Sequence, residues 1–118
     1  MLIAGSIIIM LWGIAHLVPT KNIIKGFGEI SEDNKKIITM EWIAEGLTLI
    51  FLGLIVFMLK MTGRHDPIIC TVIINLAAGM LLVLALLSLF TGAKTKILPM
   101  KLCPIVKFIV AILYMWGS

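Results

Sequence analysis

Four ionisable side chains fall inside long apolar stretches of the sequence, and they are the residues best suited to chemistry or ligand binding. Glu41 and Glu45 are one helical turn apart and therefore share a helix face. If the hydrocarbon layer begins near Ile38, Glu45 lies about 10 Å inside it, where a charge costs roughly 2.5 to 3.5 kcal/mol. We therefore expect Glu45 to face protein or a wet cavity rather than lipid.

His16 and Lys107 occur at a similar depth in two other apolar stretches. Measured from one membrane face, His16 lies about 6 Å before Thr20 and Lys107 about 12 Å beyond Pro99. This arrangement predicts a proton- or ligand-binding cluster, without assigning a catalytic residue, from Glu41, Glu45, His16 and Lys107. A structural interpretation stays open, in which Lys107 extends to the interface or a Glu–Lys pair only fixes helix register.

The composition indicates a membrane as the solvent for these residues. Of the 118 residues, 61% are hydrophobic and 14% are charged, whereas soluble domains carry about 25% charged residues. From this length we expect no extramembrane catalytic domain. Its net charge of +4 is spread over loops and helix ends, which favours lipid headgroups as partners and not nucleic acid.

No cofactor or metal site is predicted. The two cysteines, Cys70 and Cys103, form no C-x-x-C pair of the kind used for zinc binding or thiol redox chemistry. The tryptophans near the predicted membrane faces are typical interface anchors and need no cofactor.

The elements that would position the cluster are four apolar helices, expected at about residues 1–19, 32–60, 67–92 and 98–117. Ser31 can cap the second helix, Asp66 followed by Pro67 can start the third, and Gly63 can end the second. Pro104 must lie inside the fourth. Short loops make neighbouring helices antiparallel, which predicts an all-α integral membrane four-helix bundle, up-down-up-down, over residues 1–118 as a single transmembrane domain.

The loops predict how the chain is oriented in a cell membrane that it crosses several times. The first and third loops carry seven cationic residues, against Lys60 and Arg64 in the second. The positive-inside rule therefore places both termini outside. The first apolar run has no basic leader and no small-residue cleavage site, so we expect it to stay in the mature protein. The longest loop contains apolar residues at a helical spacing, which predicts a segment lying on the membrane surface: Ile23, Ile24, Phe27 and Ile30.

One segment of the second predicted helix resembles a known family. Residues 45–54, Glu-Gly-Leu-Thr-Leu-Ile-Phe-Leu-Gly-Leu, followed by the turn Thr62-Gly63-Arg64, are similar to the second helix of DoxX-like membrane proteins. The resemblance covers about a sixth of the chain. It implies an accessory subunit associated with a membrane oxidoreductase complex or with assembly, and it carries over no catalytic residue.

Three classes of function therefore stay open. The first is an accessory subunit or a bundle that binds a small ligand or lipid, with a complex partner or a second copy of the chain as its neighbour. The second is a proton-coupled transporter of the small multidrug type, whose membrane glutamate would be Glu45. The third is a lipid-modifying enzyme, with Glu45 and His16 as acid and base. Whether the protein is an enzyme is left undecided by the sequence.

Overall fold

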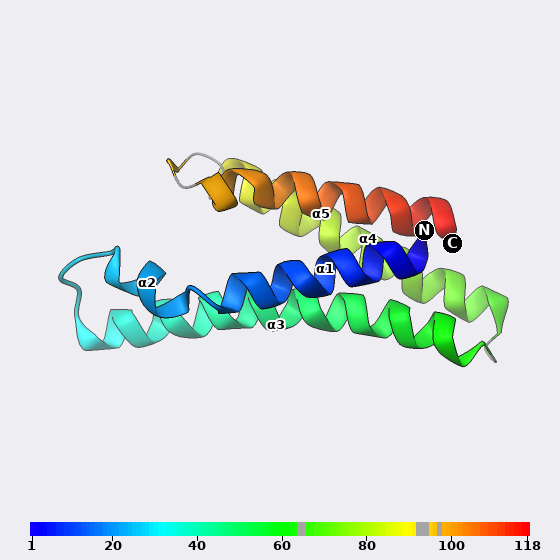
Figure 1. Ribbon diagram of the computed structural model, residues 1–118, viewed down its shortest axis with the longest axis horizontal. Coiled ribbons are helices and arrows are strands. Elements are labelled where there is room, and N and C mark those ends of the chain that lie inside the picture. The colour runs from blue at the N-terminus through cyan, green and yellow to red at the C-terminus, as the bar shows by residue number, and fades with distance from the viewer. Residues whose placement is uncertain (64–65, 92–94, 97) are drawn as a thin grey trace.

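The described part of the chain folds into helices joined by short connections and contains no strand. A computed structural model describes residues 1–63, 66–91, 95–96 and 98–118. The helices are α1 (Leu2–Leu17), α2 (Thr20–Lys25), α3 (Glu32–Thr62), α4 (Pro67–Phe90) and α5 (Leu98–Gly117) (Figure 1). The four long helices carry the polar cluster, and α2 is a single short element between the first two of them.

The starts and ends of α3 and α4 follow from capping chemistry. Ser31 accepts a hydrogen bond from the Asn34 amide at 3.1 Å, and Asp66 accepts one from the Ile68 amide at 2.8 Å. Each cap satisfies an amide that has no partner within the helix. Gly63, with φ of 65°, ends α3 in the left-handed conformation that glycine adopts without strain. The caps predicted at Ser31 and Asp66 are thus confirmed.

Two boundaries differ from the predicted ranges. Helix α1 ends at Leu17 rather than near residue 19, and the chain turns through Val18 and Pro19 into α2. Proline has no amide hydrogen to continue the helical ladder, which explains the interruption. Helix α4 ends at Phe90; residue 92, where its end was expected, lies outside the described residues. Pro104 lies inside α5, as predicted.

The long helices pack as two pairs that meet along α1 and α5. Helix α1 lies against α3, α4 lies against α5, and α1 also contacts α5, whereas α3 and α4 touch over a much smaller area. Successive long helices run in opposite directions, and the two termini lie close together at one end (Figure 1). Helix α5 therefore takes part in both the second pair and the contact between pairs.

Small residues allow α1 and α3 to approach each other closely. A Cβ atom built on Gly13 would lie 2.8 Å from the Gly46 carbonyl oxygen, and one on Gly53 would lie 2.8 Å from the Ser6 carbonyl oxygen. Contacts this short leave no room for a side chain. The α1–α3 interface is therefore of the small-residue type that is common between membrane helices.

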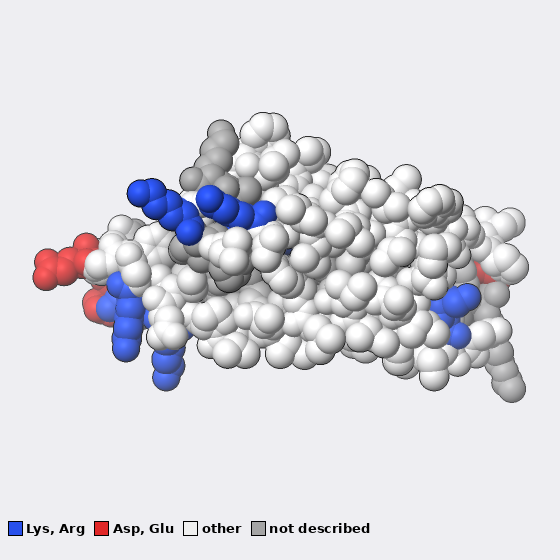
Figure 2. Space-filling view, turned by 45° about the horizontal axis from the view of Figure 1, so that its top comes forward, with Lys and Arg blue, Asp and Glu red and all other residues white. Residues whose placement is uncertain are grey.

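The outer surface fits a small integral membrane protein. Helices α3 and α4, together with Met100–Gly117 of α5, are long and apolar enough to cross a membrane, and α1 is a shorter apolar helix. In the three longer helices, between 28% and 33% of the most apolar stretch is buried within the protein. Most of the apolar side chains in these stretches therefore point outward. Charged side chains gather toward the two ends of the molecule, leaving the middle of the visible face uncharged (Figure 2). Lipid is the solvent that this surface suits.

Candidate functional site

The centre of the site is an ion pair that joins three helices. The Lys107 ammonium of α5 donates hydrogen bonds to Glu45 Oε1 of α3 and, at 2.8 Å, to Ser88 Oγ of α4. The Lys107 side chain is fully buried, whereas the Glu45 side chain is 29% exposed. A charged donor strengthens such bonds, and the opposite charge offsets much of the cost of burying the ammonium.

His16 adds the fourth long helix to the site. Its Nε2 atom lies 3.6 Å from Glu45 Oε2, which is too long for a hydrogen bond. The imidazole ring stacks on the indole of Trp42, and Trp42 Nε1 donates a hydrogen bond to the His16 carbonyl oxygen at 2.8 Å. Trp42 therefore fixes both the ring and the backbone of His16.

The Nε2 atom of His16 is buried and has no hydrogen-bond partner among the described residues. Leaving a buried polar atom unpaired costs about 1 to 3 kcal/mol, so nearly all such atoms in folded proteins find a partner. Glu45 Oε1 already accepts from Lys107, and Oε2 is the carboxylate oxygen nearest to His16. The site thus presents a ring nitrogen and a carboxylate oxygen that are close but not bonded.

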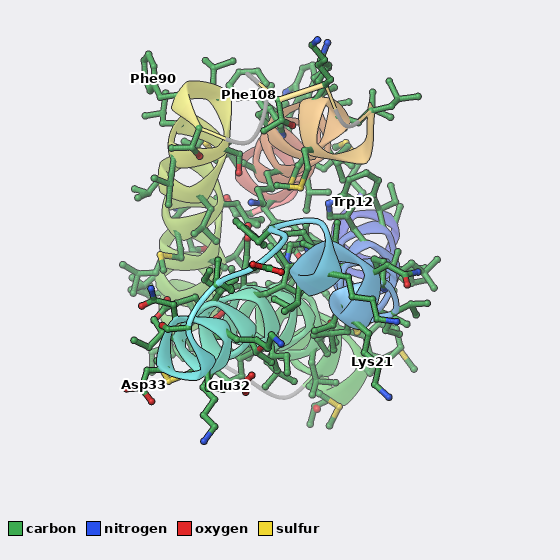
Figure 3. The ribbon with its side chains drawn as sticks, turned by 90° about the vertical axis from the view of Figure 1, so that its left-hand side faces the viewer. Trp12, Lys21, Glu32, Asp33, Phe90 and Phe108 are labelled. Carbon is green, nitrogen blue, oxygen red and sulfur yellow. The ribbon has the colours of Figure 1, made fainter. Side chains whose placement is uncertain are left out.

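A second set of contacts ties α1 to α5 beside the ion pair. Trp12 Nε1 lies 3.4 Å from Cys103 Sγ and donates a hydrogen bond to it, and the Ser88 hydroxyl lies 4.0 Å from the same sulfur atom. Figure 3, viewed from the end where α2 lies, shows Trp12 directed toward α5, while Lys21, Glu32 and Asp33 point outward. Cys103 precedes Lys107 by one helical turn and so lies on the same face of α5.

A cavity of about 380 Å³ opens next to these contacts. Its lining includes Trp12, His16, Trp42 and Cys103, and the remaining lining residues are apolar: Ala15, Pro19, Ile23, Leu98, Met100 and Leu102. The ion pair lies behind His16 and Cys103: neither Glu45 nor Lys107 is among the described lining residues. A volume of this size falls at the lower end of the range for small-molecule sites, which are typically apolar with a few placed polar groups.

The structure brings together three of the four residues that the sequence singled out. Glu45 lies next to both Lys107 and His16. Glu41 is exposed on α3 and forms no ion pair among the described residues. One turn along a helix is a shift of about 6 Å, which is enough to move Glu41 beyond the reach of Lys107. Any role for Glu41 stays a prediction.

Sequence reasoning missed Ser88, and it did not assign Trp12, Trp42 or Cys103 to the site. Ser88 is a hydroxyl residue near the end of an otherwise apolar helix. Its expected depth in the membrane matches that of Lys107, and this match could have identified it. The involvement of Cys103 was detectable from its spacing of four residues before Lys107. Nothing in the spacing indicates that Trp42 stacks on His16.

The described residues contain no group of three or more His, Cys, Asp or Glu side chains able to hold a metal ion. The formal charges of Glu45 and Lys107 cancel, so the region is polar without a net charge. Such a site is suited to hold an uncharged polar group.

Comparisons with known proteins assign no family to this arrangement. The chain matches no protein-family model, and comparisons with curated proteins and with solved structures returned no match either. The resemblance of residues 45–54 to DoxX-like proteins therefore stays a prediction, and the function has to be argued from the site itself.

Proposed function

We propose that this chain is a small membrane protein that binds an apolar or amphiphilic small molecule, such as a lipid, in the cavity beside His16. The observation that carries this proposal is the position of the cavity. Trp12, Trp42 and His16 are among its lining residues, and His16 Nε2 lies 3.6 Å from Glu45 Oε2 of the Glu45–Lys107 pair. Mostly apolar walls with a few polar groups are the usual features of a small-molecule site.

The proposal includes the topology predicted from the sequence. All four long helices cross the membrane, α1 included, although its 16 residues cover only about 24 Å against a hydrocarbon thickness of about 30 Å. Helix α3, with 31 residues, extends beyond the bilayer at its N-terminal end. The antiparallel course of the helices supports an up-down-up-down bundle, and the cationic bias of the loops supports both termini outside.

Tryptophan fluorescence provides a direct test, because two of the three tryptophans line the cavity. Trp116 is 75% exposed on α5 and does not line it, so the assay uses the Trp116→Phe protein in lipid nanodiscs. We expect a brominated single-chain amphiphile to quench Trp12 and Trp42 saturably. Ala15→Phe, which places a ring in the cavity wall, should remove the saturable part. Quenching that only rises linearly with probe in both proteins would reject binding in the cavity.

The transporter alternative receives less support from the same geometry. A proton-coupled exchanger needs a carboxylate that is free to take up and release its ligand, whereas Glu45 is held by Lys107. The enzyme alternative would use Glu45 and His16, which are near each other but not hydrogen-bonded. The accessory-subunit role rests on the DoxX-like resemblance alone, and co-purification with a large membrane complex would test it.

A further inference from the structure

A second hollow, of about 510 Å³, lies between α2 and the start of α3 and is lined by three lysines, so we call it the lysine pocket. We propose that it binds the phosphate headgroup of an anionic phospholipid, with Lys21, Lys25 and Lys35 around the phosphate and one acyl chain along α3. This site goes beyond the proposed function. Among the described residues, the lysine pocket shares no lining residue with the cavity beside His16.

The charge of the lysine pocket is the first argument. Its described wall has three ammonium groups and one carboxylate, that of Glu29. Lys21 and Lys25 form no ion pair among the described residues. The Lys35 ammonium lies 3.6 Å from Glu32, but both side chains are well exposed, and exposed pairs contribute little to stability. The pocket therefore has cationic groups that are free to bind an anion.

The placement of the lysines favours a ligand with a net negative charge. Lys21 and Lys25 are one turn apart and share a face of α2, an arrangement of like charges that destabilises a helix. Ile24 between them is buried, and α2 lies against α3, which contributes Lys35 to the same hollow. A bound phosphate would offset the repulsion among the three ammonium groups. A choline or ethanolamine head would instead bring a further cation beside them.

The level of the lysine pocket matches the layer of lipid phosphates. If the hydrocarbon begins near Ile38, Lys35 lies about 5 Å outside it, within a headgroup layer of about 5 to 7 Å. At the end of the molecule where α2 lies, acidic side chains extend farthest out, and lysines lie between them and the uncharged middle (Figure 2). The predicted orientation places this end at the cytoplasmic leaflet, where anionic lipids give the surface a negative potential.

An apolar hollow of about 570 Å³ continues from the lysine pocket along α3. Lys35 and Thr39 line both hollows. The rest of its described wall runs along one side of α3: Lys36, Met40, Ile43, Ala44 and Leu47. From Thr39 to Leu47 this wall extends about 12 Å toward the hydrocarbon, enough for part of an acyl chain. A free phosphate would leave the apolar hollow empty, so the continuity of the two hollows favours a lipid over a soluble anion.

Native mass spectrometry of the protein in detergent can measure the binding of dioleoyl phosphatidylglycerol and dioleoyl phosphatidylcholine, which differ only in the head. We expect the anionic lipid to bind about tenfold more tightly, because each lysine near an anionic head contributes about fivefold. Lys21→Gln, Lys25→Gln and Lys35→Gln should each weaken phosphatidylglycerol binding by about fivefold and leave phosphatidylcholine binding unchanged. The matched control is Lys101→Gln, an exposed lysine expected at the same membrane face that does not line the pocket, and it should have little effect.

Three further arms separate this site from its alternatives. Glu29→Gln removes the carboxylate from the described wall and should tighten phosphatidylglycerol binding. Ala15→Phe fills the cavity of the proposed function and should leave phosphatidylglycerol binding unchanged, whereas a loss would place the lipid in that cavity instead. Inorganic phosphate lacks the chain and should compete only weakly.

Three results would overturn the proposal. The first is equal binding of the two lipids, which would show that the head is not recognised by its charge. The second is an equal loss in Lys101→Gln and the three pocket variants, which would show a general effect of surface charge. The third is displacement of the lipid by inorganic phosphate at the same concentration, which would indicate a site for a soluble anion.

Discussion

The imidazole ring of His16 stacks on the indole ring of Trp42, with ring centroids 3.9 Å apart and planes inclined by 16°. The contact joins α1 to α3 at the point where both helices reach the polar site. Because Trp42 also donates a hydrogen bond to the His16 carbonyl oxygen, one side chain holds His16 in two ways. The placement of His16 in the cavity wall therefore depends on Trp42.

Replacing Trp42 should weaken the protein by a measurable amount. Trp42→Phe keeps an aromatic ring for stacking but loses the 2.8 Å hydrogen bond to His16, at an expected cost of about 0.5 to 1.5 kcal/mol. Thermal unfolding in detergent measures the effect. The matched control is Trp116→Phe, since Trp116 is 75% exposed and its side chain forms no hydrogen bond with the described residues. Equal shifts for the two variants would show that the Trp42 contact contributes nothing specific.

The close contact of α1 with α3 at Gly13 predicts that a larger residue there destabilises the protein. In Gly13→Ala the new methyl group would lie 2.8 Å from both the Gly46 carbonyl oxygen and Ile50 Cγ1, so the helices must separate. Overpacking of this kind costs about 1 to 3 kcal/mol. Gly79→Ala on α4 is the control, because nothing lies within 4 Å of its Cβ position, and it should be neutral or slightly stabilising. A stable Gly13→Ala protein would mean that α1 and α3 are less tightly packed than described.

The helical class, the caps and the depth of the polar residues were accessible from the sequence because each depends on local pattern. Ser31 and Asp66 cap amides that lie only two or three residues further along the chain. A hydrophobic stretch likewise consists of consecutive residues. The participation of Ser88 and the stacking of His16 on Trp42 depend on how helices rotate against each other. A helix such as α4, apolar all round, has no polar face from which that rotation can be read.

The cavity could not be predicted for a related reason. Its wall includes Pro19 and Ile23, which reach it because the chain breaks after α1 and folds into α2. The sequence suggested an amphipathic segment there but placed it on the membrane surface. Glu41 entered the predicted cluster because it shares a helix face with Glu45. It is exposed on α3, and its role stays a prediction.

The orientation in the membrane can be tested by labelling single cysteines. In a background with Cys70 and Cys103 replaced by serine, a cysteine at position 36 should be protected from an impermeant external reagent, and one at position 64 should react. This follows from the excess of cationic residues in the first and third loops. Reaction at position 36 with protection at position 64 would reverse the orientation. Position 64 lies outside the described residues, so the expectation there comes from the sequence alone.

The Glu45–Lys107 pair should dominate the energetics of the site, and a double-mutant cycle measures this. Glu45→Gln leaves a fully buried ammonium without an opposite charge, and Lys107→Met leaves the carboxylate without its donor. Removing one partner of a buried pair costs about 3 to 5 kcal/mol, whereas an exposed pair is worth about 0 to 1 kcal/mol. The double variant should be much more stable than the sum of the single effects implies, because it removes both charges together.

Glu41→Gln is the matched control for this cycle, since it makes the same chemical change one turn earlier on α3 at an exposed position. It should change the unfolding temperature little and show no coupling to Lys107→Met. Ser88→Ala tests the third member, because it removes the hydroxyl that accepts from Lys107 while leaving the ion pair intact. We expect a loss of about 1 kcal/mol for Ser88→Ala, smaller than either charge deletion. Additive, near-neutral effects of Glu45→Gln and Lys107→Met would show that the two side chains do not form the buried pair on which the site depends.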